Sequence, residues 1–162
     1  MLAPALKRLD VHAAREQDLA AALALQAWEQ ERNPWVGRLP ELLRAAVDEP
    51  EGEYRACVAE RDGEIVGFGV YGMVAGAVGT GAVYGVVVGA RSRRAGIGLR
   101  IMLYISEDLA KLSARLLISE IPGDPAVMKY RALLIAYGFT EETRIDDYYR
   151  DGVPQIISRF DY

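Results

Sequence analysis

Residues 83–112 constrain the chain most, because they join a buried strand to a helix through a turn rich in arginine and glycine. Residues 83–88, VYGVVV, are nearly all apolar, which is typical of a central strand. Gly96 and Gly98 then begin a segment whose apolar residues recur on one helical face: Ile97, Ile101, Ile105, Leu109 and Leu112. A helix N-terminus presents unpaired N–H groups and the positive end of the helix dipole, and glycines let an anion approach the backbone. The segment therefore predicts an anion-binding turn between a strand and a helix.

The arginines of this turn leave two interpretations open. Four of them lie close together in the sequence: Arg91, Arg93, Arg94 and Arg100. Such a cluster is often a solvated surface, but the adjacent glycines favour an anion-binding site here. The turn lacks the Lys-Ser/Thr pair of a Walker A loop and the extra glycine of a dinucleotide fingerprint. Because the net charge of −4 argues against general nucleic-acid binding, the expected ligand is an anionic cofactor.

Length and composition indicate one globular domain spanning residues 1–162. Hydrophobic residues make up 51% of the chain and charged residues 26%, and no apolar run is long enough to span a bilayer. The single cysteine, Cys57, precludes an internal disulfide and lies in an apolar stretch that predicts a core position. With His12 as the only histidine, a zinc site is not expected. We expect a cytoplasmic protein with no metal and no membrane or nucleic-acid partner.

Periodicity and turn residues predict an alternating order of strands and helices. Strands are expected at residues 6–12, 54–60, 65–74, 83–88, 115–121, 142–149 and 155–160. Helices are expected at residues 16–31, from Pro40 onward, at 96–112, and from residue 124 to Tyr137, where Gly138 follows as a stop. Residues 76–81 are expected to form a loose, glycine-rich loop. The predicted order is β-α-α-β-β-β-α-β-α-β-β.

The pattern Arg93-x-x-Gly96-x-Gly98 resembles the pyrophosphate-binding loop of the GNAT superfamily of N-acetyltransferases. The predicted order of elements is also that of the GNAT fold. Three further stretches resemble parts of family members: residues 120–122 (EIP), 136–139 (AYGF) and 147–152 (DYYRDG). The resemblance covers nearly the whole chain. It implies an α+β fold, in which a mixed and mostly antiparallel sheet is flanked by about four helices.

The resemblance implies acetyl-CoA as acetyl donor and cosubstrate, and a primary amine of a small molecule or a protein as acceptor. The pantetheine arm is expected to pair with the main chain of three strand residues, Val86, Val87 and Val88. The pyrophosphate is expected on the loop residues Arg93, Arg94, Ala95, Gly96, Ile97, Gly98 and Leu99. Gly85 is placed either to permit a bulge that opens the sheet for the arm, or to pack beneath an aromatic side chain.

The catalytic groups that the resemblance implies are only partly present. Some family members carry a glutamate base on the fourth strand, where this chain has none. Glu120, at the end of the fifth strand, is the nearest candidate base, with a surface role as the alternative. Many members use a tyrosine four residues before the Gly-Phe pair as acid, and that position is Leu134 here. Tyr130 and Tyr137, which lie on the same helical face, are the candidate acids. Tyr84 is a candidate for binding the substrate or a water molecule, and a packing role is the alternative.

These departures leave two other hypotheses open: a CoA-binding regulatory module with weak or no turnover, and an interaction domain without a cofactor. Aromatic and acidic residues in the regions that usually select the acceptor suit a cationic amine: Trp28, Glu29, Glu31, Trp35, Asp146, Asp147, Tyr148 and Tyr149. The closing DYYRDG hairpin resembles those of protein-acetylating members and slightly favours a peptide acceptor. An exposed edge at this hairpin would allow a homodimer.

Overall fold

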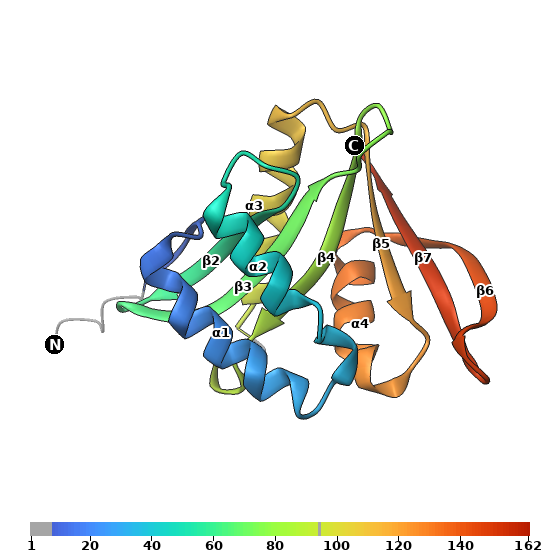
Figure 1. The fold of residues 1–162 in the computed structure, drawn as a ribbon, viewed down its shortest axis with the longest axis horizontal. Coiled ribbons are helices and arrows are strands. Elements are labelled where there is room, and N and C mark those ends of the chain that lie inside the picture. The colour runs from blue at the N-terminus through green and yellow to red at the C-terminus, as the bar shows by residue number, and fades with distance from the viewer. Residues whose placement is uncertain (1–7, 94) are drawn as a thin grey trace, which may run out of the picture.

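A seven-stranded sheet with helices on both faces forms the fold (Figure 1). The structure is a computed structural model and describes residues 8–93 and 95–162. The strands are β1 (Leu9–Ala13), β2 (Arg55–Arg61), β3 (Glu64–Met73), β4 (Thr80–Val88), β5 (Leu116–Pro122), β6 (Thr140–Arg150) and β7 (Val153–Asp161). The α-helices are α1 (Glu16–Gln30), α2 (Leu39–Asp48), α3 (Ile97–Lys111) and α4 (Met128–Tyr137). Short 3-10 turns cover Pro34–Val36, Ala90–Ser92 and Pro125–Val127.

The strands lie in the order β1-β2-β3-β4-β5-β7-β6. β4 and β5 run parallel, and the other neighbouring pairs are antiparallel. This arrangement confirms the α+β fold, with a mixed and mostly antiparallel sheet flanked by helices. The order of elements along the described residues is also the predicted one.

The largest difference from the predicted elements lies at the start of β4. The sequence places Gly81 in a loose loop, but β4 begins at Thr80 and Gly81 pairs with Leu117 of β5. A Cβ atom at Gly81 would lie 2.8 Å from side chains of both Leu109 and Leu117. The strand can therefore approach α3 this closely only because residue 81 is glycine. The loop prediction is wrong at these two positions because glycine weakens the strand pattern. The start of the strand predicted at residues 6–12 lies outside the described residues.

Two apolar cores lie on opposite faces of the sheet. On one face α1 and α2 pack against residues such as Val58 and Phe68. On the other face α3 and α4 pack around residues such as Ile101 and Leu134. Cys57 is fully buried in this second core, as the sequence predicts. Within the described residues, the helices are too short or too polar to cross a membrane.

The sheet opens between β4 and β5. The two strands pair over residues 80–82 of β4 only, and they diverge beyond that point (Figure 1). The next carbonyl group, that of Val83, accepts a hydrogen bond from the Ser119 hydroxyl at 2.9 Å, and the Tyr130 hydroxyl lies 3.4 Å from it. Side chains therefore satisfy the β4 main chain where strand pairing stops, so the gap is a built part of the fold.

A bulge in β4 lies beside this opening. The register with β3 shifts by one residue at Tyr84, which is the extra residue of the bulge. Gly85 follows it, and a Cβ atom at Gly85 would lie 2.8 Å from the Leu39 side chain. Both sequence interpretations of Gly85 thus apply in part, since it lies next to a bulge and packs beneath a side chain. That side chain is aliphatic and not aromatic.

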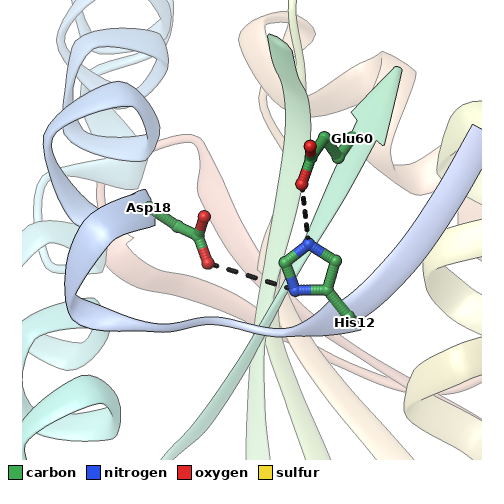
Figure 2. A group of neighbouring side chains, drawn as sticks. All are labelled: His12, Asp18 and Glu60. Carbon is green, nitrogen blue, oxygen red and sulfur yellow. Dashed lines mark hydrogen bonds and ion pairs between the residues drawn. The ribbon is translucent and has the colours of Figure 1, made fainter. Parts of the chain in front are cut away.

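A polar cluster joins β1, β2 and the start of α1 (Figure 2). The His12 ring lies between two carboxylates, with Nε2 at 3.0 Å from Glu60 and Nδ1 at 4.0 Å from Asp18. Nδ1 also lies 2.9 Å from the Ala13 carbonyl oxygen. Arg15 donates to Asp18 at 3.2 Å and lies 3.9 Å from Glu60. The guanidinium, together with the imidazole when it is protonated, offsets the two carboxylates, so we assign the cluster a structural role.

We expect the stability of the protein to depend on pH through His12. Partial burial lowers the pKa of His12, and the positive charge of Arg15 lowers it further. The interactions with Glu60, the Ala13 carbonyl and Asp18 raise the pKa by more, so the net effect is a raised pKa. A raised folded-state pKa adds stability below the unfolded value of 6.5, and this stability is lost as pH rises through the folded value. His12→Gln should therefore cost more free energy of unfolding at pH 5.5 than at pH 8.5, by less than about 1 kcal/mol.

Urea unfolding of both proteins at the two pH values measures this difference. Glu60→Gln serves as the matched control, because it removes the carboxylate nearest to the ring and should flatten the same pH dependence. An equal cost of His12→Gln at both pH values would contradict the proposed charge on the ring.

Candidate functional site

A cavity of about 860 Å³ lies in the gap between β4 and β5. Its wall includes Val86–Val88, the turn before α3, the end of β5, part of α4, and the connection between α1 and α2. Since both helical layers contribute to the wall, the cavity passes through the sheet and is not confined to one face. Its volume is typical of sites that bind small molecules.

The β4 segment Val86–Val88 lines the cavity. The N–H of Gly89 donates to the Val66 carbonyl of β3 at 2.8 Å, and main-chain groups of successive strand residues point to opposite sides. The main chain of Val88 and Val86 therefore points away from β3, into the gap. The Val88 carbonyl accepts a hydrogen bond from Arg93 Nε at 3.2 Å. Val86 presents its donor and acceptor toward the cavity.

Gly96 forms the turn that begins α3. It lies at φ 72°, in the left-handed region that favours glycine, and a Cβ atom there would meet nothing within 4 Å. The first helical bond runs from the Arg100 N–H to the Gly96 carbonyl at 3.1 Å. The N–H groups of Ile97, Gly98 and Leu99 therefore have no acceptor within the helix. Gly96 combines open space with several N–H donors that have no acceptor in the helix, as an anion-binding turn requires.

The other residues of the turn have different roles. Gly98 lines the cavity, but a Cβ atom there would lie 3.1 Å from Leu133, so this glycine also lets α3 approach α4. The side chain of Ile97 is buried in the core and anchors the first turn of the helix. Ala95 and Leu99 are exposed. A ligand on this turn would therefore meet mainly backbone, with Leu99 beside it.

Arg93 is paired inside the protein. Its guanidinium lies 2.5 Å from the Glu29 carboxylate of α1 and donates to the Val88 carbonyl, and its Cζ lies 5.2 Å from the centre of the Trp28 ring. The sequence suggests that Arg93 adds a charged hydrogen bond to the pyrophosphate, whereas the structure directs its charge to α1. Arg94 lies outside the described residues. Lys129, on α4, is a cation that lines the cavity.

Glu120 and Tyr84 reach the cavity from its two sides. Glu120 is exposed on β5 and accepts a hydrogen bond from Gln155 Nε2 at 3.2 Å. Tyr84, in the β4 bulge, packs edge-on against Tyr54 with ring centres 5.4 Å apart. Burial first, and then the nearby Tyr54 and Glu53, raise the pKa of Tyr84, so its hydroxyl stays protonated at neutral pH. The cavity therefore holds a carboxylate opposite a neutral hydroxyl.

The structure separates the two tyrosines of α4. Tyr130 lines the cavity, and its hydroxyl lies 2.9 Å from the Ser119 hydroxyl. Burial raises the pKa of Tyr130, which keeps the group protonated. Tyr137 does not line this cavity, and its ring packs 5.3 Å from the Phe160 ring. Leu134 is fully buried in the core.

The connection between α1 and α2 closes one end of the cavity. Trp35 packs against Tyr149 of β6, with ring centres 5.2 Å apart, and Arg150 lies 5.4 Å from the centre of the Trp35 ring. Arg150 also lies 3.6 Å from Asp124, before α4. The sequence analysis places Trp35 and Tyr149 in the acceptor region, and both line the cavity.

Sequence reasoning missed several polar residues of the site, among them Asn33, Arg38 and Ser119. Asn33 and Arg38 line the cavity, and Ser119 bonds to the Val83 carbonyl at its edge. A small polar residue within the apolar strand LLISEIP was the available signal for Ser119. No local signal distinguishes Asn33 or Arg38 from ordinary loop residues.

Comparisons with known proteins agree with this geometry. The sequence pattern of the acetyltransferase (GNAT) family matches residues 20–130 of the chain. No curated protein matches it in sequence. A GNAT-family protein from Desulfovibrio desulfuricans has a similar structure, with 20% identity and a TM-score of 0.86 over 95% of this chain and 99% of that one.

Two further solved structures share the fold. The ribosomal-protein-alanine N-acetyltransferase of Brucella melitensis is 20% identical, with a TM-score of 0.72 over 94% of this chain and 99% of that one. The protein yncA of Salmonella typhimurium, whose structure contains its cofactor acetyl-CoA, is 14% identical, with a TM-score of 0.71 over 94% of this chain and 93% of that one.

Proposed function

The chain belongs to the GNAT family of acetyltransferases, and we propose that it acts as one domain that transfers an acetyl group from acetyl-CoA to a primary amine. One observation carries this proposal: the sheet opens between β4 and β5 directly beside a glycine turn with free N–H groups. A long ligand with an anionic end fits this arrangement. The pyrophosphate would bind the N–H groups at Gly96–Leu99, and the pantetheine arm would pair with Val86 in the gap.

The acceptor must lose a proton before it attacks. An alkyl amine has a pKa near 10.4, so forming its neutral state at pH 7 costs about 4.6 kcal/mol. Glu120 would accept this proton, directly or through a water molecule. The amine nitrogen then adds to the thioester carbonyl carbon, and the Val86 N–H would stabilise the negative oxygen that forms. Collapse breaks the C–S bond and releases coenzyme A.

The leaving thiolate needs only modest assistance. A thiol pKa near 8.5 makes thiolate a fair leaving group, so a proton donor speeds the reaction without being essential. Tyr130 is protonated and lines the cavity, and is therefore our candidate acid. Tyr137 lies elsewhere, in an aromatic cluster with Phe139 and Phe160.

Substitution of each tyrosine tests this assignment. We expect Tyr130→Phe to lower kcat about 10-fold. General acid catalysis usually contributes about 10²-fold or more, and the expected effect is smaller here because thiolate is already a fair leaving group. Tyr137→Phe is the matched control on the same helix and should keep the wild-type kcat. Steady-state rates of coenzyme A release measure both. Equal rates for the two variants would remove Tyr130 from the mechanism.

A second candidate function is a CoA-binding regulatory module with little turnover. The buried Leu134, in the position where the family often has a tyrosine, favours it, as does the existing bond between the Tyr130 and Ser119 hydroxyls. Thermal unfolding with coenzyme A, together with transfer assays on a broad amine panel, separates the two functions. Coenzyme A at 100 times its Kd should add about 2.7 kcal/mol of stability in either case. Binding without transfer to any amine would favour the module.

A further inference from the structure

The acceptor end of the cavity combines one carboxylate with two hydrogen-bond donors. Glu120 lies on β5, while Asn33 and Arg38 come from the connection between α1 and α2. Tyr84 lines the same cavity, and the charges of Arg38 and Glu120 both act on its hydroxyl. A positive and a negative protein group therefore line the same cavity as this hydroxyl.

The charge of Arg38 is available to a ligand. Four other charged residues near the cavity are already paired, since Glu29 bonds to Arg93 and Asp124 lies beside Arg150, whereas Lys129 on α4 lines the cavity as a second cation. Within residues 8–93 and 95–162, Arg38 has no such carboxylate partner. An anionic group of a ligand at the acceptor end would meet this guanidinium.

Asn33 supplies the second donor. Its side chain is 4% exposed, and its Oδ1 accepts the Trp35 N–H at 3.2 Å. For the described part of the chain, the Nδ2 group has no hydrogen-bond acceptor, although the residue lines the cavity. The amide nitrogen is open to the cavity and has no acceptor among the described residues, so a ligand oxygen at this position could accept its hydrogen bond.

The remaining wall is largely apolar. Leu39, which packs on Gly85, and Leu42 and Val36 give the acceptor end a hydrocarbon surface. The contact of Trp35 with Tyr149 and the ion pair of Arg150 with Asp124 join the two sides across this end. An extended peptide would have to break both contacts, whereas a small acceptor fits inside them.

We propose that the acceptor is a free α-amino acid with an apolar side chain, held with its amine at Glu120 and its carboxylate at Arg38 and Asn33. This inference rests on the proposed acetyl transfer. The α-ammonium gives one proton to Glu120, the nitrogen forms a bond to the acetyl carbon and loses its second proton, the C–S bond breaks, and the sulfur leaves as thiolate and takes up that second proton. The products are an N-acetyl amino acid and, after the thiolate takes up a proton, coenzyme A.

A matched series of acceptors tests this proposal. Leucine and phenylalanine are the test acceptors. Each is compared with its amide, with the amine that lacks the carboxylate, and with a peptide that begins with the same residue, and spermidine is assayed as a separate polyamine acceptor. We expect kcat/KM for the free amino acid to exceed that of the amide and the amine by roughly 10- to 100-fold, as for a hydrogen bond to a charged group. Equal rates across the series, or a preference for the peptide or spermidine, would overturn the proposal.

A variant pair locates the carboxylate site. Arg38→Gln should reduce the preference for the amino acid over the matching amine about 10-fold or more. Arg44→Gln is the control, because Arg44 is exposed on α2, the helix that follows Arg38, and does not line the cavity. An unchanged preference in Arg38→Gln would show that Arg38 does not bind the carboxylate. Transfer to amines without a preference for the carboxylate overturns only this inference, whereas coenzyme A binding without transfer to any acceptor overturns the proposed function with it.

Discussion

Replacing Gly96 by aspartate is expected to weaken coenzyme A binding more than about 100-fold, while the protein still folds. A Cβ atom at this position enters open space, so the fold itself has room for the new side chain. The added carboxylate would occupy the place of the pyrophosphate and repel its negative charge. Each charged hydrogen bond lost costs about 1.5–3 kcal/mol, and two such bonds account for the expected change. Isothermal titration calorimetry with coenzyme A measures the loss.

Gly76→Asp provides the control for Gly96→Asp. Gly76 also has a positive φ, of 80°, and a Cβ atom there likewise meets nothing within 4 Å. It does not line the cavity. Both variants should lose a similar amount of stability, about 1–2 kcal/mol at most, since aspartate tolerates this conformation better than most residues. Wild-type affinity in Gly96→Asp, or an equal loss in both variants, would show that the turn does not hold the pyrophosphate.

Replacing Glu120 by glutamine is expected to lower kcat/KM for the amine by about 10²- to 10⁴-fold, the usual contribution of a general base. Glutamine has nearly the same shape and keeps an oxygen that can accept the hydrogen bond from Gln155. Coenzyme A affinity should therefore remain at the wild-type value. A pH–rate profile adds a second measurement, since the variant should regain activity at high pH, where more of the amine is already neutral.

The control for Glu120→Gln is Glu107→Gln. Glu107 is exposed on α3 and does not line the cavity, so its variant changes the net charge by the same amount at a distant site. We expect it to retain wild-type activity at all pH values. If Glu120→Gln behaves in the same way, the proton leaves by another route, and Glu120 is a surface residue of the cavity.

The fold was predictable because its signals are local. The apolar spacing of Ile97, Ile101 and Ile105 predicts α3, and these three side chains are indeed buried. The Asp62-Gly63 pair predicts the turn between β2 and β3, where both residues have positive φ. Local patterns fail where packing overrides propensity. Gly81 lies in a strand although glycine disfavours strands, because the side chains of Leu109 and Leu117 leave no room there for a larger residue.

The site was less predictable because its contacts join distant parts of the chain. Arg93 belongs to the predicted loop, but its partner Glu29 lies on α1, and no spacing rule connects the two. Tyr130 and Tyr137 are equivalent candidates by helical spacing, and only the packing of α4 shows that one faces the cavity and the other an aromatic cluster. The main chain carries most of the expected cofactor contacts, which explains why the glycine turn was the strongest signal in the sequence.

The passage of the cavity through the sheet has a kinetic consequence. Because both helical layers line it, the thioester and the amine can approach β4 from opposite faces without competing for the same space. Cys57 is unsuited to carry the acetyl group between them, since it is buried in the core and burial raises the pKa of its thiol. If the protein transfers acetyl groups as proposed, we expect direct aminolysis within a ternary complex, without an acetyl-enzyme, so that neither substrate has to leave before the other arrives.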